Sequence, residues 1–243
     1  MVNTLQGEQK RRAEALTSVF ENGTTTINYA AIEPLDDGRG YTAGRAGFTT
    51  ATGDALLVVK RYTERVPQNP LAKYLPTLER LAESESDDVS ELEGFAVAWH
   101  EAAHDTRFRA AQDAINDELY FEPAMDMAKS LGITTALGQA ILYDTIIQHG
   151  GGSDADSLSA LVARTKYRVG GTPKTGIAES PWLAAFLDVR AQDLLHPANT
   201  TTQEVWAVSV GRVRVFEKLL RENNLALRGP IVVHTPEYEA TIQ

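Results

Sequence analysis

The chain has 243 residues, enough for one large domain or one domain with two lobes, and 43% of them are apolar, which suffices for a hydrophobic core. The 23 basic residues are outnumbered by 33 acidic ones, so the net charge of −10 argues against nucleic acid or an anionic membrane as the main partner and suits a cationic one. Because the sequence has no cysteine, it excludes disulfides, thiolate nucleophiles and cysteine metal sites.

The amino-terminal segment has helical periodicity. Apolar side chains recur at helical spacing from about Leu5 to Phe20, and Gly23 is a natural stop. The stretch from Met1 to Arg12 is polar, so we expect no signal peptide within it. No apolar run approaches the roughly 20 residues that a membrane span needs.

Between Thr24 and Thr50 the character of the sequence changes. β-Branched residues and glycines replace the helical pattern and predict short strands joined by turns, with Asp37-Gly38 in or near a turn. We therefore expect a small antiparallel sheet in this segment.

From Thr52 onward the pattern predicts an almost entirely helical chain. The expected helices run from Thr52 to Pro67, from about Leu71 to Ala82, from about Glu91 to Ser130 with a break near Pro123, from Ala136 to His149, and near 156–165, 178–193 and 202–222. The predicted architecture is α+β and mainly α, with the sheet segregated from the helices.

Two carboxylates stand out near the start of the chain. Glu21 lies at a predicted helix carboxyl end, where the helix dipole disfavours a negative charge and so favours the protonated acid. Asp37 is beside Arg39, which favours an ionised base, and the Thr42 hydroxyl can help to hold a water. Paired carboxylates in different environments are what glycoside hydrolysis needs. The simpler interpretations are a solvated surface residue for Glu21 and a turn former for Asp37.

A second pattern matches the zinc peptidases. His100-Glu101-Ala102-Ala103-His104 would place two histidines on one helix face with a glutamate between them, and Glu122 is a possible third ligand. The charged residues that follow favour an ordinary surface helix.

An aspartate also lies inside the most apolar predicted helix. Burying Asp144 costs free energy unless the carboxylate is paired, and Arg190 and Arg212 are natural partners on later helices. The ion pairs of Asp144 with these arginines either stabilise the fold alone or also support a catalytic site.

Several stretches, in their order along the chain, resemble the bacterial chitosanases of glycoside hydrolase family 46. They include Glu21-Asn22, Asp37-Gly38-Arg39-Gly40-Tyr41-Thr42, Gly47-Phe48, Thr52-Gly53-Asp54, Tyr120-Phe121-Glu122-Pro123-Ala124, Tyr143-Asp144, His149-Gly150 and Phe186-Leu187-Asp188-Val189-Arg190.

The resemblance implies a lysozyme-like fold: a single catalytic domain with two lobes, a small sheet in the first, and a substrate cleft between them. The sheet-containing lobe would come mainly from about 20–90 and the helical lobe from about 105–243. The implied activity is endo-hydrolysis of β-1,4 bonds between glucosamine units of chitosan, with inversion. Inversion requires carboxyl groups roughly 6.5–9.5 Å apart.

The resemblance also implies roles for individual residues. Glu21 would be the general acid, Asp37 the general base, and Thr42 would help Asp37 to hold the attacking water. The residues implied in substrate binding are Asn22, Arg39, Gly47, Asp54 and His149. The residues implied in an ion network that supports Glu21 are Asp144, Arg190 and Arg212.

In this family His100 and His104 would lie outside the site, and no metal or organic cofactor is needed. The expected partners are chitosan and its oligosaccharides, acted on by a secreted monomer whose signal peptide has been removed. The rival hypotheses are a zinc metallopeptidase that uses His100-Glu101-x-x-His104 and a non-catalytic polysaccharide-binding protein.

Overall fold

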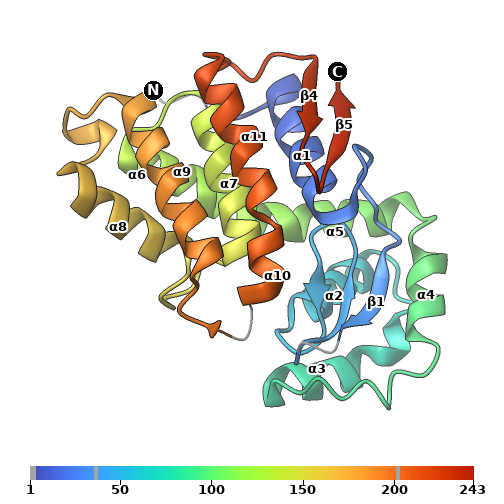
Figure 1. The fold of residues 1–243 in the computed structure, drawn as a ribbon. Coiled ribbons are helices and arrows are strands. Elements are labelled where there is room, and N and C mark those ends of the chain that lie inside the picture. The colour runs from blue at the N-terminus through green and yellow to red at the C-terminus, as the bar shows by residue number, and fades with distance from the viewer. Residues whose placement is uncertain (1–3, 36–37, 201–202) are drawn as a thin grey trace. The chain divides into compact units, whose positions relative to one another are not determined.

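A computed structural model describes residues 4–35, 38–200 and 203–243, and its chain divides into two compact units (Figure 1). The terminal unit comprises Met1–Thr26 and Tyr120–Gln243, and the central unit comprises Ile27–Leu119. The terminal unit thus joins the amino-terminal helix to the carboxy-terminal part of the chain, while the central unit holds the sheet near the amino terminus. The expected single catalytic domain stays a prediction.

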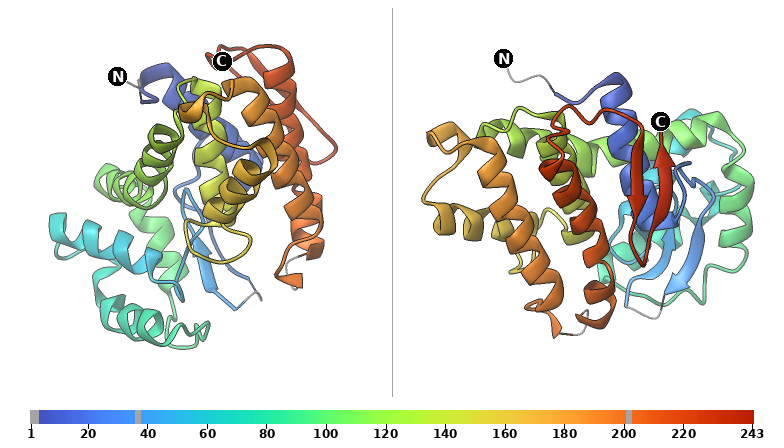
Figure 2. Two further views of the ribbon diagram at one scale, coloured as in Figure 1. Left: turned by 90° about the vertical axis from the view of Figure 1, so that its left-hand side faces the viewer. Right: turned by 45° about the horizontal axis from the view of Figure 1, so that its top comes forward.

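The terminal unit is built around one buried helix. Its elements are the helices α1 (Gly7–Asn22), α6 (Glu122–Leu131), α7 (Ala136–His149), α8 (Leu158–Val169), α9 (Glu179–Leu195), α10 (Gln203–Val208) and α11 (Val210–Arg221), a 3₁₀ turn η3 (Pro173–Thr175), and the strands β4 (Ile231–His234) and β5 (Glu239–Ile242). Helix α7 packs against α1, α6, α8 and α11, so it lies among the other helices of this unit (Figure 2). Because its sequence is apolar around nearly its whole circumference, it can be enclosed in this way.

Helix α7 begins and ends where its sequence predicts. The Thr135 hydroxyl caps its amino end by accepting a hydrogen bond from the Gly138 N–H at 3.1 Å. Its residues from Ala136 to Ile146 are all buried. The predicted bounds, Ala136 to His149, are confirmed.

The carboxy-terminal hairpin corrects the expectation of an almost entirely helical chain after Thr52. Strands β4 and β5 are antiparallel, with Ile231 opposite Ile242. Burial alternates along β4, since Ile231 and Val233 are buried and Val232 is exposed. This two-residue period is typical of a strand with one buried face, and β5 lies against α1.

The central unit holds a three-stranded sheet and four α-helices among its described residues. Its elements are β1 (Ile32–Leu35), β2 (Gly40–Ala43), β3 (Phe48–Thr49), α2 (Asp54–Arg65), the 3₁₀ turn η1 (Ala72–Tyr74), α3 (Leu75–Ser84), α4 (Phe95–Ala102) and α5 (Thr106–Asn116), after which a π-helical turn, η2, spans Asp117–Phe121. The strand order is β1-β2-β3 and both pairs are antiparallel. The predicted α+β, mainly α fold of the lysozyme-like class is confirmed.

Aromatic side chains anchor the sheet within the central unit. The rings of Phe95 and Trp99 are 5.8 Å apart, and Trp99 meets Phe108 edge-on at 4.9 Å. The Trp99 Nε1–H and the Gln112 side-chain amide both donate to the Tyr29 carbonyl, at 3.1 and 2.9 Å. These bonds fix the chain just before β1.

The expected long helix from Glu91 to Ser130 is wrong near residue 103. Helix α4 ends at Ala102, and α5 begins after Asp105, whose carboxylate accepts a hydrogen bond from the Arg107 N–H at 2.8 Å. A local amino-terminal cap thus interrupts a helical periodicity that continues on both sides. Over the part of the chain that is described, every helix is too short or too polar to span a membrane.

Two glycines that end helices give a matched test of backbone packing. Gly132 after α6 and Gly170 after α8 have nearly the same left-handed φ, 77° and 76°. A Cβ on Gly132 would lie 2.6 Å from the Lys174 backbone nitrogen, whereas a Cβ on Gly170 would meet nothing within 4 Å. We expect Gly170→Ala to lower the free energy of unfolding by about 1–2 kcal/mol, from backbone strain alone.

Gly132→Ala should cost about 1–3 kcal/mol more, because the backbone at Lys174 must also move. Urea unfolding of both variants measures the difference. Equal losses in the two variants would contradict the close approach at Gly132.

Candidate functional site

The end of α1 presents the first predicted catalytic carboxylate. Gly23 terminates the helix in the left-handed region, with its N–H donating to the Val19 carbonyl at 3.0 Å. Glu21 therefore lies in the last turn of α1, and its side chain is 29% exposed. Its Oε1 accepts a hydrogen bond from Arg212 Nη1 at 2.9 Å, so an arginine on α11 fixes one of its oxygens.

Asp144 is the centre of the polar contacts behind Glu21. Its carboxylate is completely buried on α7 and lies between two arginines. Arg212 Nη2 is 2.8 Å from Oδ1 and Arg190 Nη2 is 2.8 Å from Oδ2. The Thr17 hydroxyl on α1 adds a third donor, at 3.3 Å from Oδ1. The structure thus brings together Asp144, Arg190, Arg212 and Glu21.

Opposite charges meet at short range in this network. Burial opposes the ionisation of Asp144, but the two arginines overcome it and lower the pKa of the carboxyl. Burial lowers the pKa of Arg190 to about 10. Burial also opposes the charge of Arg212, yet Asp144 and Glu21 together raise the pKa of that guanidinium. Asp144 and both arginines are therefore charged at neutral pH.

Neutralising Asp144 should destabilise the protein strongly. Asp144→Asn leaves two buried guanidinium groups short of a counter-charge, and breaking a buried pair in this way costs about 3–5 kcal/mol. The matched control is Asp188→Asn on α9, which breaks a half-exposed pair with Arg168 and should cost about 0–1 kcal/mol. Thermal unfolding of both variants makes the comparison, and losses of similar size would show that the Asp144 network is not stabilising.

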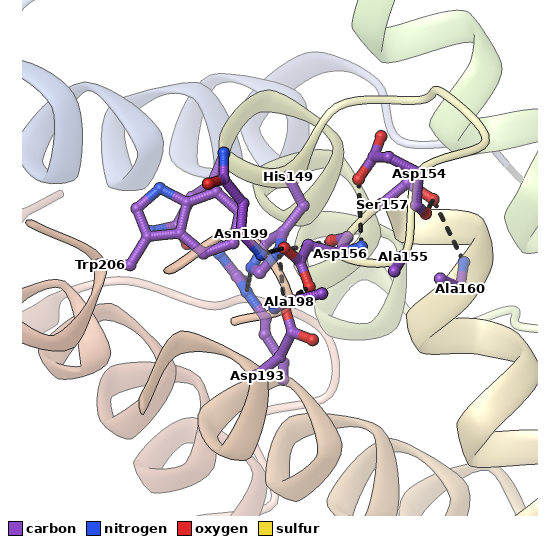
Figure 3. Close-up of polar contacts among 12 residues, drawn as sticks. His149, Asp154, Ala155, Asp156, Ser157, Ala160, Asp193, Ala198, Asn199 and Trp206 are labelled. Carbon is purple, nitrogen blue, oxygen red and sulfur yellow. Dashed lines mark hydrogen bonds and ion pairs between the residues drawn. The ribbon is translucent and has the colours of Figure 1, made fainter. Parts of the chain in front are cut away.

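His149 ends α7 inside a second group of polar contacts. Its Nδ1 is 2.9 Å from the Asp156 carbonyl oxygen, and its Nε2 is 3.4 Å from Arg190 Nε. Figure 3 shows the imidazole among Asp156, Asp193 and Trp206. Its side chain has 0% exposure. The predicted role of His149 in substrate binding stays a prediction, and in this conformation the imidazole offers a substrate no direct contact.

The stability of the protein should depend on the protonation of His149. Burial lowers the pKa of the imidazole, an effect that exceeds the opposing influence of Asp193. In the unfolded chain the pKa of histidine is about 6.5. The unfolded state therefore binds more protons just below that pH, so stability falls as the pH falls through it, by at most about 1.4 kcal/mol per pH unit.

His149→Gln removes this contribution. Urea unfolding at a series of pH values should show the difference in stability between the native protein and His149→Gln shrinking as the pH falls from neutral. A difference that is constant over this range would contradict a buried, neutral His149.

The other predicted catalytic residues belong to the central unit. Thr42 lies on the middle strand, β2, opposite Glu33 on one side and Thr49 on the other. Its hydroxyl oxygen is buried and has no hydrogen-bond partner among the described residues. Asp37 lies outside the described residues, so its separation from Glu21 stays a prediction.

The predicted substrate-binding residues of the central unit lie in and beside turns. Arg39 is exposed in the turn that precedes β2, and Gly47 precedes β3 with a φ of 65°. Asp54 is the first residue of α2, and its Oδ1 accepts hydrogen bonds from the Thr49 N–H and the Thr52 hydroxyl, both at 2.7 Å. Asp54 therefore ties β3 to the positive end of α2, a structural role that the sequence reasoning missed.

Asn22, the remaining predicted substrate-binding residue, is the last residue of α1 in the terminal unit. Its side-chain Nδ2 is buried without a hydrogen-bond acceptor in the described part of the chain. A buried donor without an acceptor is costly and rare, so it calls for a functional explanation.

The zinc-peptidase pattern does not form a continuous helix face. His100 lies on α4, but the helix ends at Ala102 and His104 follows in the turn. Both histidines and Glu101 are exposed. Within residues 4–35, 38–200 and 203–243, no group of three or more His, Cys, Asp or Glu side chains could hold a metal ion.

The sequence reasoning also missed several contacts of the network. Gln148 accepts a hydrogen bond from Arg190 at 2.6 Å, and Asp193 is a buried carboxylate paired with Arg164. The sequence could have predicted a role for Asp193 in ion pairing, because it stands three residues after Arg190 in an apolar helix and a buried aspartate needs a partner.

The sequence pattern of glycosyl hydrolase family 46 matches residues 15–231. The chain belongs to this family. A chitosanase from Bacillus subtilis strain 168 is 59% identical to it over 234 residues, which are 96% of this chain and 84% of that protein.

Solved structures of family members agree with the fold. A mutant chitosanase from Bacillus subtilis MY002, complexed with 6 GlcN, superposes with a TM-score of 0.94 at 57% identity, covering 98% of this chain and all (100%) of that chain. The Gynuella sunshinyii GH46 chitosanase complexed with chitotetraose has a TM-score of 0.94 at 44% identity, covering 99% of both chains.

Proposed function

We propose that this protein hydrolyses the β-1,4 bonds between glucosamine units within chitosan and releases chitooligosaccharides. Its membership of glycosyl hydrolase family 46 and the chitosanases among its relatives support the substrate. The observation that carries the proposal is the carboxyl group of Glu21, which Arg212 and the buried Asp144 hold at the end of α1.

The charge of the protein suits this substrate. Protonated chitosan is a polycation, and a chain with a net charge of −10 attracts it. Individual carboxylates can then pair with the ammonium groups of glucosamine. Asp54 is the residue that we propose for such a contact, with Asn22, Arg39 and Gly47 as further contacts to the sugar.

Glu21 is the general acid of the proposed mechanism. Its Oε1 accepts from Arg212, while Oε2 takes no hydrogen bond from any residue that the structure describes. Oε2 can therefore carry the proton that passes to the glycosidic oxygen as the bond to the anomeric carbon breaks. The guanidinium that holds Oε1 fixes the direction of that transfer.

Asp37 is the general base on the opposite face of the sugar. It takes a proton from a water whose oxygen attacks the anomeric carbon, so the configuration of that carbon is inverted. The Thr42 hydroxyl, which lacks a partner among the described residues, is available to help hold this water.

Since chitosan is a polymer too large to cross a membrane, we also propose that the protein acts outside the cell. A monomeric state and independence from nucleic acids and membranes stay predictions.

Replacing the general acid should nearly abolish cleavage. General acid catalysis contributes on the order of 10²–10⁴-fold, so Glu21→Gln should lower kcat on chitosan by about that factor while glucosamine oligosaccharides still bind. Glu8→Gln, on the exposed face of the same helix, is the matched control and should keep full activity. Reducing-end release and calorimetric binding are the measurements, and substantial turnover by Glu21→Gln would remove Glu21 from the acid role.

The configuration of the fresh product reports the mechanism directly. Inversion of a β-linkage gives the α-anomer first, because water enters from the face opposite the leaving group. Proton NMR during the first minutes of hydrolysis resolves the two anomeric signals before they equilibrate. A β-anomer that appears first would mean retention.

A further inference from the structure

The contacts behind Glu21 do not end at Arg190. Its guanidinium is completely buried and donates from Nη2 to Asp144 and Gln148, while its Nε points to His149 Nε2 at 3.4 Å. Asp144 therefore meets an arginine whose other edge is held by the imidazole. If that acceptor were lost, Arg190 would keep its contacts on one side only.

The partners of His149 define which of its nitrogens carries the proton. The Asp156 carbonyl oxygen, 2.9 Å from Nδ1, can only accept a hydrogen bond, so Nδ1 must donate. The guanidinium Nε of Arg190 can only donate, so Nε2 must present its lone pair. Both contacts are satisfied by one state, the neutral imidazole with its proton on Nδ1.

A buried carboxylate also favours a proton on Nδ1. Asp193 Oδ2 lies 3.5 Å from His149 Nδ1, which is longer than a good hydrogen bond but close enough for electrostatic attraction to the Nδ1–H. This oxygen is buried without a hydrogen bond in the part of the chain that the structure describes. The other oxygen, Oδ1, pairs with Arg164, which reaches in from α8 and compensates the charge.

We propose that His149 and Asp193 are positioning residues for the reaction: the Asp156 carbonyl oxygen, assisted by the nearby Asp193 carboxylate, holds His149 as the Nδ1–H tautomer, whose Nε2 holds Arg190 against Asp144 and so fixes Arg212 and Glu21. This inference rests on the proposed function, since it assigns the network to the chemistry of Glu21. It differs from the expectation that His149 binds substrate, because the imidazole has 0% exposure and acts through Arg190.

Protonation of His149 would break the arrangement. The imidazolium would turn Nε2 into a donor that faces the donor Nε of Arg190, and two buried cations would then repel each other. The charged groups that face the ring are Arg190 and Asp193 on α9, with Arg164 of α8 behind Asp193. Asp144 lies beyond Arg190 on α7, and the Asp156 carboxylate is turned to the N–H groups of Ala198 and Asn199.

Burial lowers the pKa of His149, which extends the required neutral form toward lower pH. Lower pH also favours the protonated, polycationic form of chitosan. A buried, neutral His149 that holds Arg190 therefore suits an enzyme that must act on a protonated substrate.

The tautomer can be measured without any assay of activity. Long-range proton–nitrogen NMR of the native protein should show one of its five histidines as a neutral Nδ1–H tautomer, and that signal should be absent from His149→Gln. An Nε2–H tautomer, or an imidazolium at neutral pH, would overturn the proposal. This result stands whether or not the protein cleaves chitosan.

Kinetics then test whether the contact serves the reaction. His149→Leu removes the acceptor for Arg190 and should lower kcat on chitosan by about 10- to 100-fold with KM little changed, the effect expected of a misplaced catalytic group. His149→Gln keeps an acceptor near the position of Nε2 and should recover most of the loss. His196→Leu, at the exposed end of α9, is the control and should behave like the native protein.

A raised KM with unchanged kcat in His149→Leu would instead show that His149 binds substrate, and would overturn the positioning role.

Asp193→Asn should also lower kcat, and it should move the His149 nitrogen signals. If neither changes, Asp193 does not act on His149. A native protein that leaves chitosan intact would refute the proposed function, while the NMR result would still decide the state of His149.

Discussion

A single buried carboxylate organises the terminal unit. Asp144 lies on a helix that is enclosed by its neighbours, where an unpaired charge would cost several kcal/mol. Arg190 on α9 and Arg212 on α11 must therefore reach it, and Thr17 on α1 adds a hydrogen bond. Three helices that are distant in sequence are thus required to present specific side chains to one point on α7.

The same requirement connects the core to the chemistry. Arg212 is shared between Asp144 and Glu21, so the position of the proposed general acid depends on a carboxylate that no substrate touches. Preorganisation of this kind lets a catalytic group act without first reordering its surroundings. On the other side, Arg190 extends the network to His149 and Asp193, and the order of donors and acceptors leaves one protonation state for the imidazole.

The parts of this structure that sequence predicts well are those in which one strong physical signal dominates. The apolar run of α7 is long enough to define both of its ends, and the cost of burying Asp144 points to arginine partners that the structure does supply. A glutamate just before a terminating glycine likewise predicts the place of Glu21.

The features that escaped prediction depend on short or competing signals. Each strand of the carboxy-terminal hairpin has only four residues, too few for its alternating pattern to stand out. The cap formed by Asp105 interrupts a periodicity that predicts one continuous helix. Because the first helix ends before His104, the two histidines of the zinc-peptidase motif do not share a helix face. The contacts of His149 could not be foreseen, because they join α7 to a loop and to α9 through tertiary packing alone.

The central claim is that a buried ion network, and not the end of α1 alone, holds Glu21 for proton transfer. Its most direct test is the turnover of chitosan by Asp144→Asn, measured well below the unfolding temperature of the variant and together with oligosaccharide binding. We expect folded protein that binds oligosaccharide normally but has lost on the order of 100-fold in kcat, since small displacements of a catalytic group have effects of that size. A folded Asp144→Asn protein with the kcat of the native enzyme would contradict the account.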